Sequence, residues 1–150
     1  MKKAVVWLLL PFFVSCYDRP DLAELRNNRL RWETRGISNY TYEFQAECFC
    51  SVEFSQRCAV RVDNDTVTSV TIVETQLPVV ESKDRWKSIE QLFDIAQYAI
   101  EHADRFMITY DETYGYPSRI EVDYYTNAVD DEITFKAANL ISIKKSDRKD

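Results

Sequence analysis

The chain has 150 residues, which is enough for one domain with a modest core, and it carries a formal net charge of −6 at pH 7. An acidic surface repels the phosphate backbone of nucleic acids, and no cluster of basic residues offsets it, so we predict no nucleic-acid partner. The only glycines are Gly36 and Gly115, which excludes the glycine-rich loops that bind nucleotide phosphates.

The first fifteen residues have the layout of a secretory signal peptide. Lys2 and Lys3 precede an uncharged, apolar run at residues 4–14, and the small residue Ser15 closes it. A run of this length is too short to cross a bilayer, which needs ~20 apolar residues. We therefore predict a signal peptide at residues 1–15 that is removed from the mature chain.

Cys16 directly follows this segment, and the ending Phe13-Val14-Ser15-Cys16 resembles a bacterial lipobox. In a lipobox the cysteine is lipidated and becomes the first residue of the mature protein. This predicts attachment to membrane lipid through Cys16 and a location in the bacterial cell envelope, outside the cytoplasm. Tyr17 gives no retention signal, which favours the outer membrane where the host has one. The alternative is an ordinary cleaved signal with an incidental cysteine, since Phe13 stands where a lipobox usually has leucine.

A short tether at residues 16–21 should lead into one domain over residues 22–143, followed by a polar tail at residues 144–150. Asp21 begins a D-x-x-E pattern, a variant of the capping box, which predicts the start of a helix. Gly36 supplies the left-handed residue that ends this helix.

Three strands are predicted to follow the first helix. Apolar and polar residues alternate strictly over residues 40–48, which is the pattern of a half-buried strand. Residues 58–62 continue the alternation in a second strand. A turn at residues 63–65 then leads into a third strand at residues 66–74.

The second half repeats this order of elements. Ser88 caps a helix and Gln91 completes a capping box, and the apolar residues within 89–103 form one continuous stripe. The strands expected after this helix are residues 105–111, 120–124 and 133–137.

The order helix, three strands, helix, three strands predicts an α+β fold built from two αβββ units, which we interpret as a structural duplication. Because short turns join consecutive strands, the sheet should be antiparallel, with about six strands and the two helices on one face.

Four segments together resemble a family of uncharacterised bacterial lipoproteins that is catalogued as a domain of unknown function. The segments are residues 36–42 running into Cys48-Phe49-Cys50, residues 88–94, residues 110–111 with 114–117, and residues 130–133. The resemblance covers most of residues 22–143 and includes the lipobox. It implies a cell-envelope lipoprotein, and it implies no known activity, cofactor or catalytic residue. Cys58 departs from the family pattern, which usually has the C-x-C pair alone.

Three cysteines, Cys48, Cys50 and Cys58, remain once Cys16 is lipidated, and they lie in an oxidising compartment. Their even numbers place all three on one face of the predicted strands. We predict a structural disulfide between Cys48 and Cys58, with Cys50 as the alternative partner of Cys58. The competing hypothesis is a metal site or a redox C-x-C pair built from these cysteines. A metal site needs further ligands nearby, and the single histidine, His102, is distant in sequence, so we predict no metal.

His102 is the one residue that could act alone as a general base. We expect it at the end of the second helix, where a histidine meets the carbonyl dipoles, and no nucleophile pattern surrounds it. The acidic clusters at residues 63–65, 111–112 and 130–132 match no calcium loop and are better explained as turn residues. We therefore predict no catalytic residue, no cofactor and no small-molecule substrate.

Two features suit contact with another protein. Tyr114 and Tyr116 lie in a tight turn, and aromatic residues on loops are common in protein interfaces. The outward face of the sheet should carry mixed charges, among them Arg119 and Glu121. We therefore predict a non-enzymatic lipoprotein that binds or scaffolds, with these four as candidate protein-binding residues. The alternative is an inhibitor or accessory subunit that binds an envelope protein through the polar sheet face.

Overall fold

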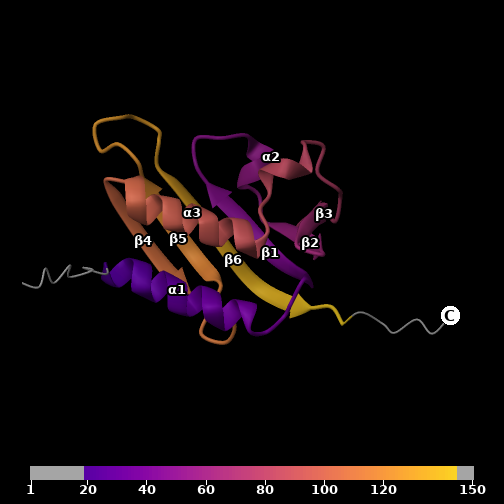
Figure 1. The fold of residues 1–150 in the computed structure, drawn as a ribbon. Helices are drawn as coiled ribbons and strands as arrows, with labels where there is room; N and C mark the ends of the chain where they lie inside the picture. Colours follow the sequence, from indigo (N-terminus) through magenta and orange to yellow (C-terminus); the bar gives the residue numbers. More distant parts are fainter. Residues whose placement is uncertain (1–18, 145–150) are drawn as a thin grey trace, which may run out of the picture.

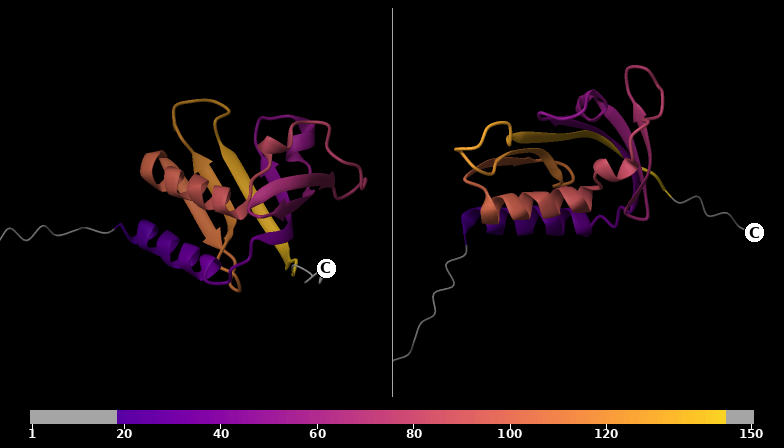
Figure 2. Two further views of the ribbon diagram at one scale, coloured as in Figure 1. Left: turned by 45° about the vertical axis from the view of Figure 1, so that its right-hand side comes forward. Right: turned by 90° about the horizontal axis from the view of Figure 1, so that it is seen from above.

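The computed structural model describes residues 19–144 and places six antiparallel strands in one sheet. Its helices are α1 (Pro20–Glu33), α2 (Val52–Ser55) and α3 (Ile89–His102), with a 3-10 turn, η1 (Lys83–Arg85). Its strands are β1 (Asn39–Glu47), β2 (Cys58–Asp63), β3 (Thr66–Ile72), β4 (Arg105–Tyr110), β5 (Pro117–Asp123) and β6 (Ile133–Ser142). α1 and α3 lie side by side along one face of the sheet (Figure 1, Figure 2). The predicted α+β class and the antiparallel sheet of six strands are confirmed.

The predicted signal peptide, Cys16 and most of the predicted tail lie outside the described residues 19–144. The described part begins at Arg19, whose guanidinium donates a hydrogen bond of 3.0 Å to the carbonyl oxygen of Ile100, near the end of α3. Between residues 19 and 144, no helix combines the length and the apolar character needed to cross a bilayer.

The first and last strands of the domain are neighbours in the middle of the sheet. The strand order is β3-β2-β1-β6-β5-β4, so β1 pairs with β2 on one side and with β6 on the other. The β1–β6 pairing runs from Tyr40 opposite Ser142 to Glu47 opposite Thr134. Two three-stranded meanders are thus joined through segments far apart in the sequence.

The two halves share an order of elements, but they are not superposable copies. Both meanders progress across the sheet in the same direction, whereas their first strands, β1 and β4, point in opposite directions. A rotation that superposes β1–β3 on β4–β6 therefore turns the sheet over. It would place α1 on the face opposite to α3. Because α1 and α3 cover the same face (Figure 2), the geometry does not support the predicted structural duplication.

The two long helices begin in different ways. α3 has the predicted capping box, in which Ser88 Oγ accepts from the Gln91 N–H (3.3 Å) and Gln91 Oε1 accepts from the Ser88 N–H (2.9 Å). α1 starts at Pro20, whose fixed φ suits the first helical position, and Arg19 before it makes no side-chain capping bond. The predicted start of α1 at an Asp21 capping box is therefore wrong.

β1 supplies the centre of the core. Its fully buried residues, which point toward the helices, are Tyr40, Tyr42, Phe44 and Ala46. The Tyr42 hydroxyl donates to the carbonyl oxygen of Lys87, and the Tyr40 hydroxyl accepts from the Ile89 N–H at 2.8 Å. These bonds satisfy two buried hydroxyls and fix the start of α3 against the sheet.

Candidate functional site

The disulfide joins Cys48 to Cys50, and Cys58 is a free, buried thiol. The predicted Cys48–Cys58 pairing and its Cys50–Cys58 alternative are therefore wrong. The β1–β2 register explains why, because Cys58 lies opposite Phe44. Cys48 follows the last residue of β1, four positions beyond Phe44, and at ~3.3 Å per strand residue this is a displacement of about 13 Å, far beyond the reach of a disulfide. Burial also raises the pKa of the Cys58 thiol, which leaves it in its unreactive protonated form.

The disulfide closes a very tight turn around Phe49. The Cys50 N–H donates to the Cys48 carbonyl oxygen at 2.9 Å, so the bridge and a backbone hydrogen bond constrain the same residues. We call Cys48-Phe49-Cys50 the Phe49 turn. The side chain of Phe49 is 86% exposed, whereas both cysteines are half-buried. The turn therefore holds a large apolar side chain out in solvent.

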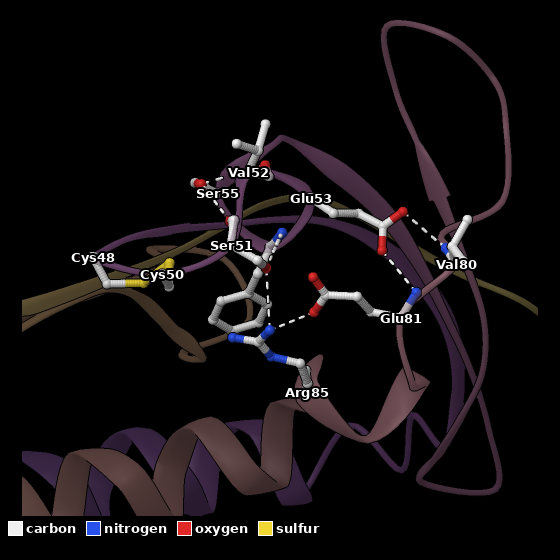
Figure 3. A network of polar contacts seen from close by, with 10 residues as sticks. Cys48, Cys50, Ser51, Val52, Glu53, Ser55, Val80, Glu81 and Arg85 are labelled. Carbon is white, nitrogen blue, oxygen red and sulfur yellow. Dashed lines mark hydrogen bonds and ion pairs between the residues drawn. A yellow bond between two sulfur atoms is a disulfide. The ribbon is translucent and has the colours of Figure 1, made fainter.

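The segment after the Phe49 turn is fixed by a polar network (Figure 3). Glu53, on α2, accepts hydrogen bonds from two successive backbone N–H groups, those of Val80 and Glu81, each at 2.8 Å. Arg85 donates to Ser51 Oγ at 3.1 Å and pairs with the Glu81 carboxylate. A hydrogen bond from Ser51 and the charge of Arg85 lower the pKa of the Glu81 carboxyl, so it is ionised at neutral pH. The network ties α2 to the connection between β3 and α3.

The same segment is also anchored in the core. Phe54, on α2, is 6% exposed and packs its ring 5.7 Å from Phe44 and 5.5 Å from Trp86, measured between ring centroids. The Arg85 guanidinium lies 4.5 Å from the centroid of the Phe54 ring, within the range of a cation–π contact. Gln45, on β1, donates to the Ser55 carbonyl oxygen at 3.2 Å. None of these contacts uses the disulfide.

The model of a family of unknown function (DUF6174) matches residues 24–142. The chain belongs to this family. The match confirms the resemblance to a domain of unknown function, and it spans β1 to β6 together with the Phe49 turn of this DUF6174 domain. Comparison with curated proteins and with solved structures returned no match.

Tyr116 belongs to the core of the DUF6174 domain and not to an exposed patch. It is 2% exposed, its ring lies edge-on 6.3 Å from that of Trp32, and burial raises its pKa to about 12. The turn folds onto α1, because a Cβ added at Gly115 would lie 2.8 Å from the Asn28 carbonyl oxygen. Tyr114 is half-buried and stacks 6.4 Å from Tyr116. Burial of Tyr116 leaves it almost no surface for a partner, whereas Tyr114 stays partly exposed, so a binding role remains a prediction for Tyr114.

Arg119 and Glu121 lie on the sheet face away from the helices and form an ion pair with each other. Lys136, on the neighbouring strand β6, pairs with Glu47 of β1 in the same way. A shallow groove of about 330 Å³ adjoins Glu121 and is lined partly by Met107. Charges on this face are therefore largely neutralised in local pairs, which weakens their attraction for a charged partner.

His102 is the last residue of α3, as predicted. Its Nδ1 lies 3.0 Å from the Tyr98 carbonyl oxygen, and its ring stacks on Tyr98 with centroids 4.2 Å apart. In the described range 19–144, no three His, Cys, Asp or Glu side chains are placed so that they could hold a metal ion. The acidic cluster at Asn64 and Asp65 forms a turn, with φ of 49° and 61°.

Glu90 is a polar centre that the sequence reasoning missed. Its carboxylate accepts from the Trp32 indole N–H at 2.7 Å and from the Tyr40 hydroxyl at 3.2 Å. It also lines a hollow of about 310 Å³ with Asp65, whose pKa is raised by burial and by the charge of Glu90. The one sequence signal is an acidic residue in the first turn of α3, which is ordinary at a helix start. Its contacts join α1, β1 and α3, which is a structural role.

Proposed function

We propose that this chain is a lipid-anchored protein of the bacterial cell envelope that binds another protein through the Phe49 turn and catalyses no reaction. The anchor is supported by the sequence of residues 1–16 alone, with its lipobox-like ending at Cys16. The single observation that carries the binding role is the exposure of Phe49, at 86%, on a turn that is closed by a disulfide.

A rigid aromatic side chain is well suited to anchor a protein interface. Aromatic residues dominate the binding energy of interfaces, because they bury a large area while few rotatable bonds are fixed. The Cys48–Cys50 bridge fixes the backbone on both sides of Phe49 before any partner binds. Little conformational entropy is then lost on association, which favours affinity. Val52, three residues after Phe49, adds a second exposed apolar side chain, since it is 78% exposed.

The proposed anchor also restricts where a partner can be. Only Tyr17 and Asp18 separate Cys16 from Arg19, and Arg19 is fixed to Ile100 at the end of α3. Such a linker reaches about 10 Å at most. The domain would therefore stay next to the bilayer, so its partner is an envelope protein close to the same membrane.

The binding role is tested by co-purification from detergent-solubilised membranes of cells that express the full chain. Phe49→Ser removes the proposed anchor residue, and Tyr125→Ser is the matched control, because Tyr125 is also exposed, at 68%, on another loop. We expect a partner to be lost with Phe49→Ser and retained with Tyr125→Ser. Equal recovery of the partner with both variants would rule out the Phe49 turn as the contact.

The polar sheet face is the alternative surface, and it would suit an inhibitor or accessory subunit. Exchanging the two charges, Arg119→Glu with Glu121→Arg, preserves the local ion pair while it reverses the pattern presented to a partner. Loss of the partner from this double variant, with Phe49→Ser without effect, would assign the contact to the sheet face.

The anchor has its own test. Cys16→Ala should move the protein from the membrane fraction to the soluble fraction, and mass spectrometry of the native amino terminus should show acyl chains on Cys16. A native amino terminus without lipid would exclude the anchor and leave the binding proposal untouched.

A further inference from the structure

The Cys48–Cys50 disulfide is poorly placed to stabilise the fold. A disulfide stabilises mainly by restricting the unfolded chain, and this effect grows with the length of the loop that it closes. Cys48 and Cys50 are separated by only two positions, so the bridge restricts the unfolded chain less than one that closes a longer loop. A bridge between β1 and β2 would have restricted much more of the chain. A purely structural account therefore explains this disulfide only in part.

The surroundings of the bridge are fixed by contacts that do not involve it. Glu53 is bonded to two backbone N–H groups of the β3–α3 connection, and Phe54 is packed in the core beside Trp86. Gln45, at the end of β1, is bonded to the Ser55 carbonyl oxygen. These contacts flank the Phe49 turn on its carboxyl side and along β1, and none involves a sulfur atom. We therefore expect the remainder of the loop to stay in place when the pair opens to two thiols.

The bridge is more accessible to an attacking thiolate than Cys58 is. Cys48 and Cys50 are half-buried on either side of the exposed Phe49, whereas Cys58 has 0% exposure. Exchange at this loop therefore involves two sulfur atoms only, and Cys58 neither attacks the bridge nor competes for a partner. An apolar residue exposed between two exchangeable sulfurs suits the peptide chain of another protein.

We propose that the Cys48–Cys50 disulfide undergoes thiol–disulfide exchange with a pair of cysteines in the protein that binds the Phe49 turn. This proposal rests on the proposed function, since the partner brings its thiols to the turn by binding Phe49. A partner thiolate attacks one bridge sulfur, the Sγ–Sγ bond breaks, and the displaced sulfur leaves as a thiolate that takes a proton from water. The second partner thiolate then attacks the mixed disulfide. The partner ends as a disulfide, and Cys48 and Cys50 end as thiols, so one bridge oxidises one dithiol.

The first test measures how readily the bridge is reduced. The full chain, purified in detergent, is equilibrated in glutathione buffers set to the potential of an oxidising compartment, alkylated and examined by mass spectrometry. We expect oxidised and reduced forms of the Cys48–Cys50 pair within about tenfold of each other, whereas a structural disulfide stays oxidised by more than about a thousandfold. Cys58 should remain unmodified until the protein is unfolded. A bridge that behaves as a structural disulfide would overturn the proposal.

The second test measures exchange itself. Oxidised protein is mixed with a reduced synthetic peptide that carries two cysteines, and we expect one peptide disulfide for each protein molecule. The double variant Cys48→Ser with Cys50→Ser should form none, and reduced wild-type protein should retain its circular-dichroism spectrum and Tm. Loss of the fold on reduction, or no peptide oxidation by wild-type protein, contradicts the proposal.

The two proposals fail in different ways. Phe49→Ser removes the proposed contact residue, so the partner should be lost and the peptide should be oxidised more slowly than by wild-type protein. Retention of the partner by this variant would refute the binding role without touching exchange with the peptide. Retention of binding by the double cysteine variant, together with a bridge that resists reduction, would refute exchange alone.

Discussion

Gly115 offers a direct test of the conclusion that the 111–116 turn is packed against α1 and is not an open recognition loop. The substitution is Gly115→Ala, and the matched control is Gly36→Ala. Both glycines have positive φ, +84° and +61°, so an alanine at either position takes on the strain of the left-handed region. They differ in what the new methyl group meets.

The expected losses of stability follow from the surroundings. At Gly36 no atom lies within 4 Å of the new Cβ, so the loss is the backbone strain alone, about 1 kcal/mol. At Gly115 the Cβ lies 2.8 Å from the Asn28 carbonyl oxygen and 3.1 Å from Arg31 Cδ. The oxygen is part of the α1 backbone and cannot move without moving the helix, so we expect a total loss of about 3 kcal/mol.

The assay is equilibrium unfolding in urea, followed by tryptophan fluorescence. Trp32 is a suitable probe, because its ring lies 6.3 Å from that of Tyr116 beside the turn. Equal losses for the two alanine variants would show that the turn does not pack on α1. The buried position of Tyr116 would then have to be abandoned, and the turn would return as a candidate recognition loop.

Three further predictions concern other parts of the fold. Ser88→Ala removes the capping box of α3 and should lower the free energy of unfolding by about 1 kcal/mol in thermal denaturation. Asp65→Asn should raise Tm at neutral pH, with a gain of less than about 1 kcal/mol in the free energy of unfolding. The pKa of Asp65 is raised in the folded state, so its ionisation opposes folding, and stability is lost as pH rises through that folded-state pKa. The gain should vanish in acid, where Asp65 is protonated in both states. Glu53→Gln should weaken the hold of α2 on the Val80 N–H and speed hydrogen exchange at that amide, at a loss of about 1 kcal/mol.

Each of these predictions has a result that contradicts it. An unchanged Tm for Ser88→Ala would mean that the capping bonds are replaced by water at no cost. A stabilisation by Asp65→Asn that persists unchanged in acid would mean that ionisation of Asp65 is not its cause. Unaltered exchange at Val80 in Glu53→Gln would show that the charge of the carboxylate is not needed to hold the connection.

The regular elements could be predicted from the sequence because their signals are local. The strict alternation at residues 40–48 corresponds to β1, whose burial alternates in the same way. The Ser88–Gln91 capping box is present with both of its bonds. The predicted start of α1 was wrong, because Pro20 also favours the first helical position and the helix begins there, one residue before the D-x-x-E pattern.

The candidate site could not be predicted, because it depends on register and tertiary packing. Alternation along the strands places Cys48 and Cys58 on one face, but it does not fix the register, in which Phe44 lies opposite Cys58. The helix α2 has four residues, which is too short for a periodic pattern, so the network around Glu53 could not be predicted from the sequence. The sequence predicts Tyr116 to be an exposed turn residue, but the turn packs against the distant helix α1 and Tyr116 is buried.

The central place of β1 and β6 in the sheet governs when this protein can fold. Glu47 and Thr134 face each other in a pairing that no local segment can supply, so the core forms only after the end of the chain is present. On the proposed export from its amino terminus, the chain would therefore lack its central strand pairing until the carboxyl-terminal strand had crossed the membrane.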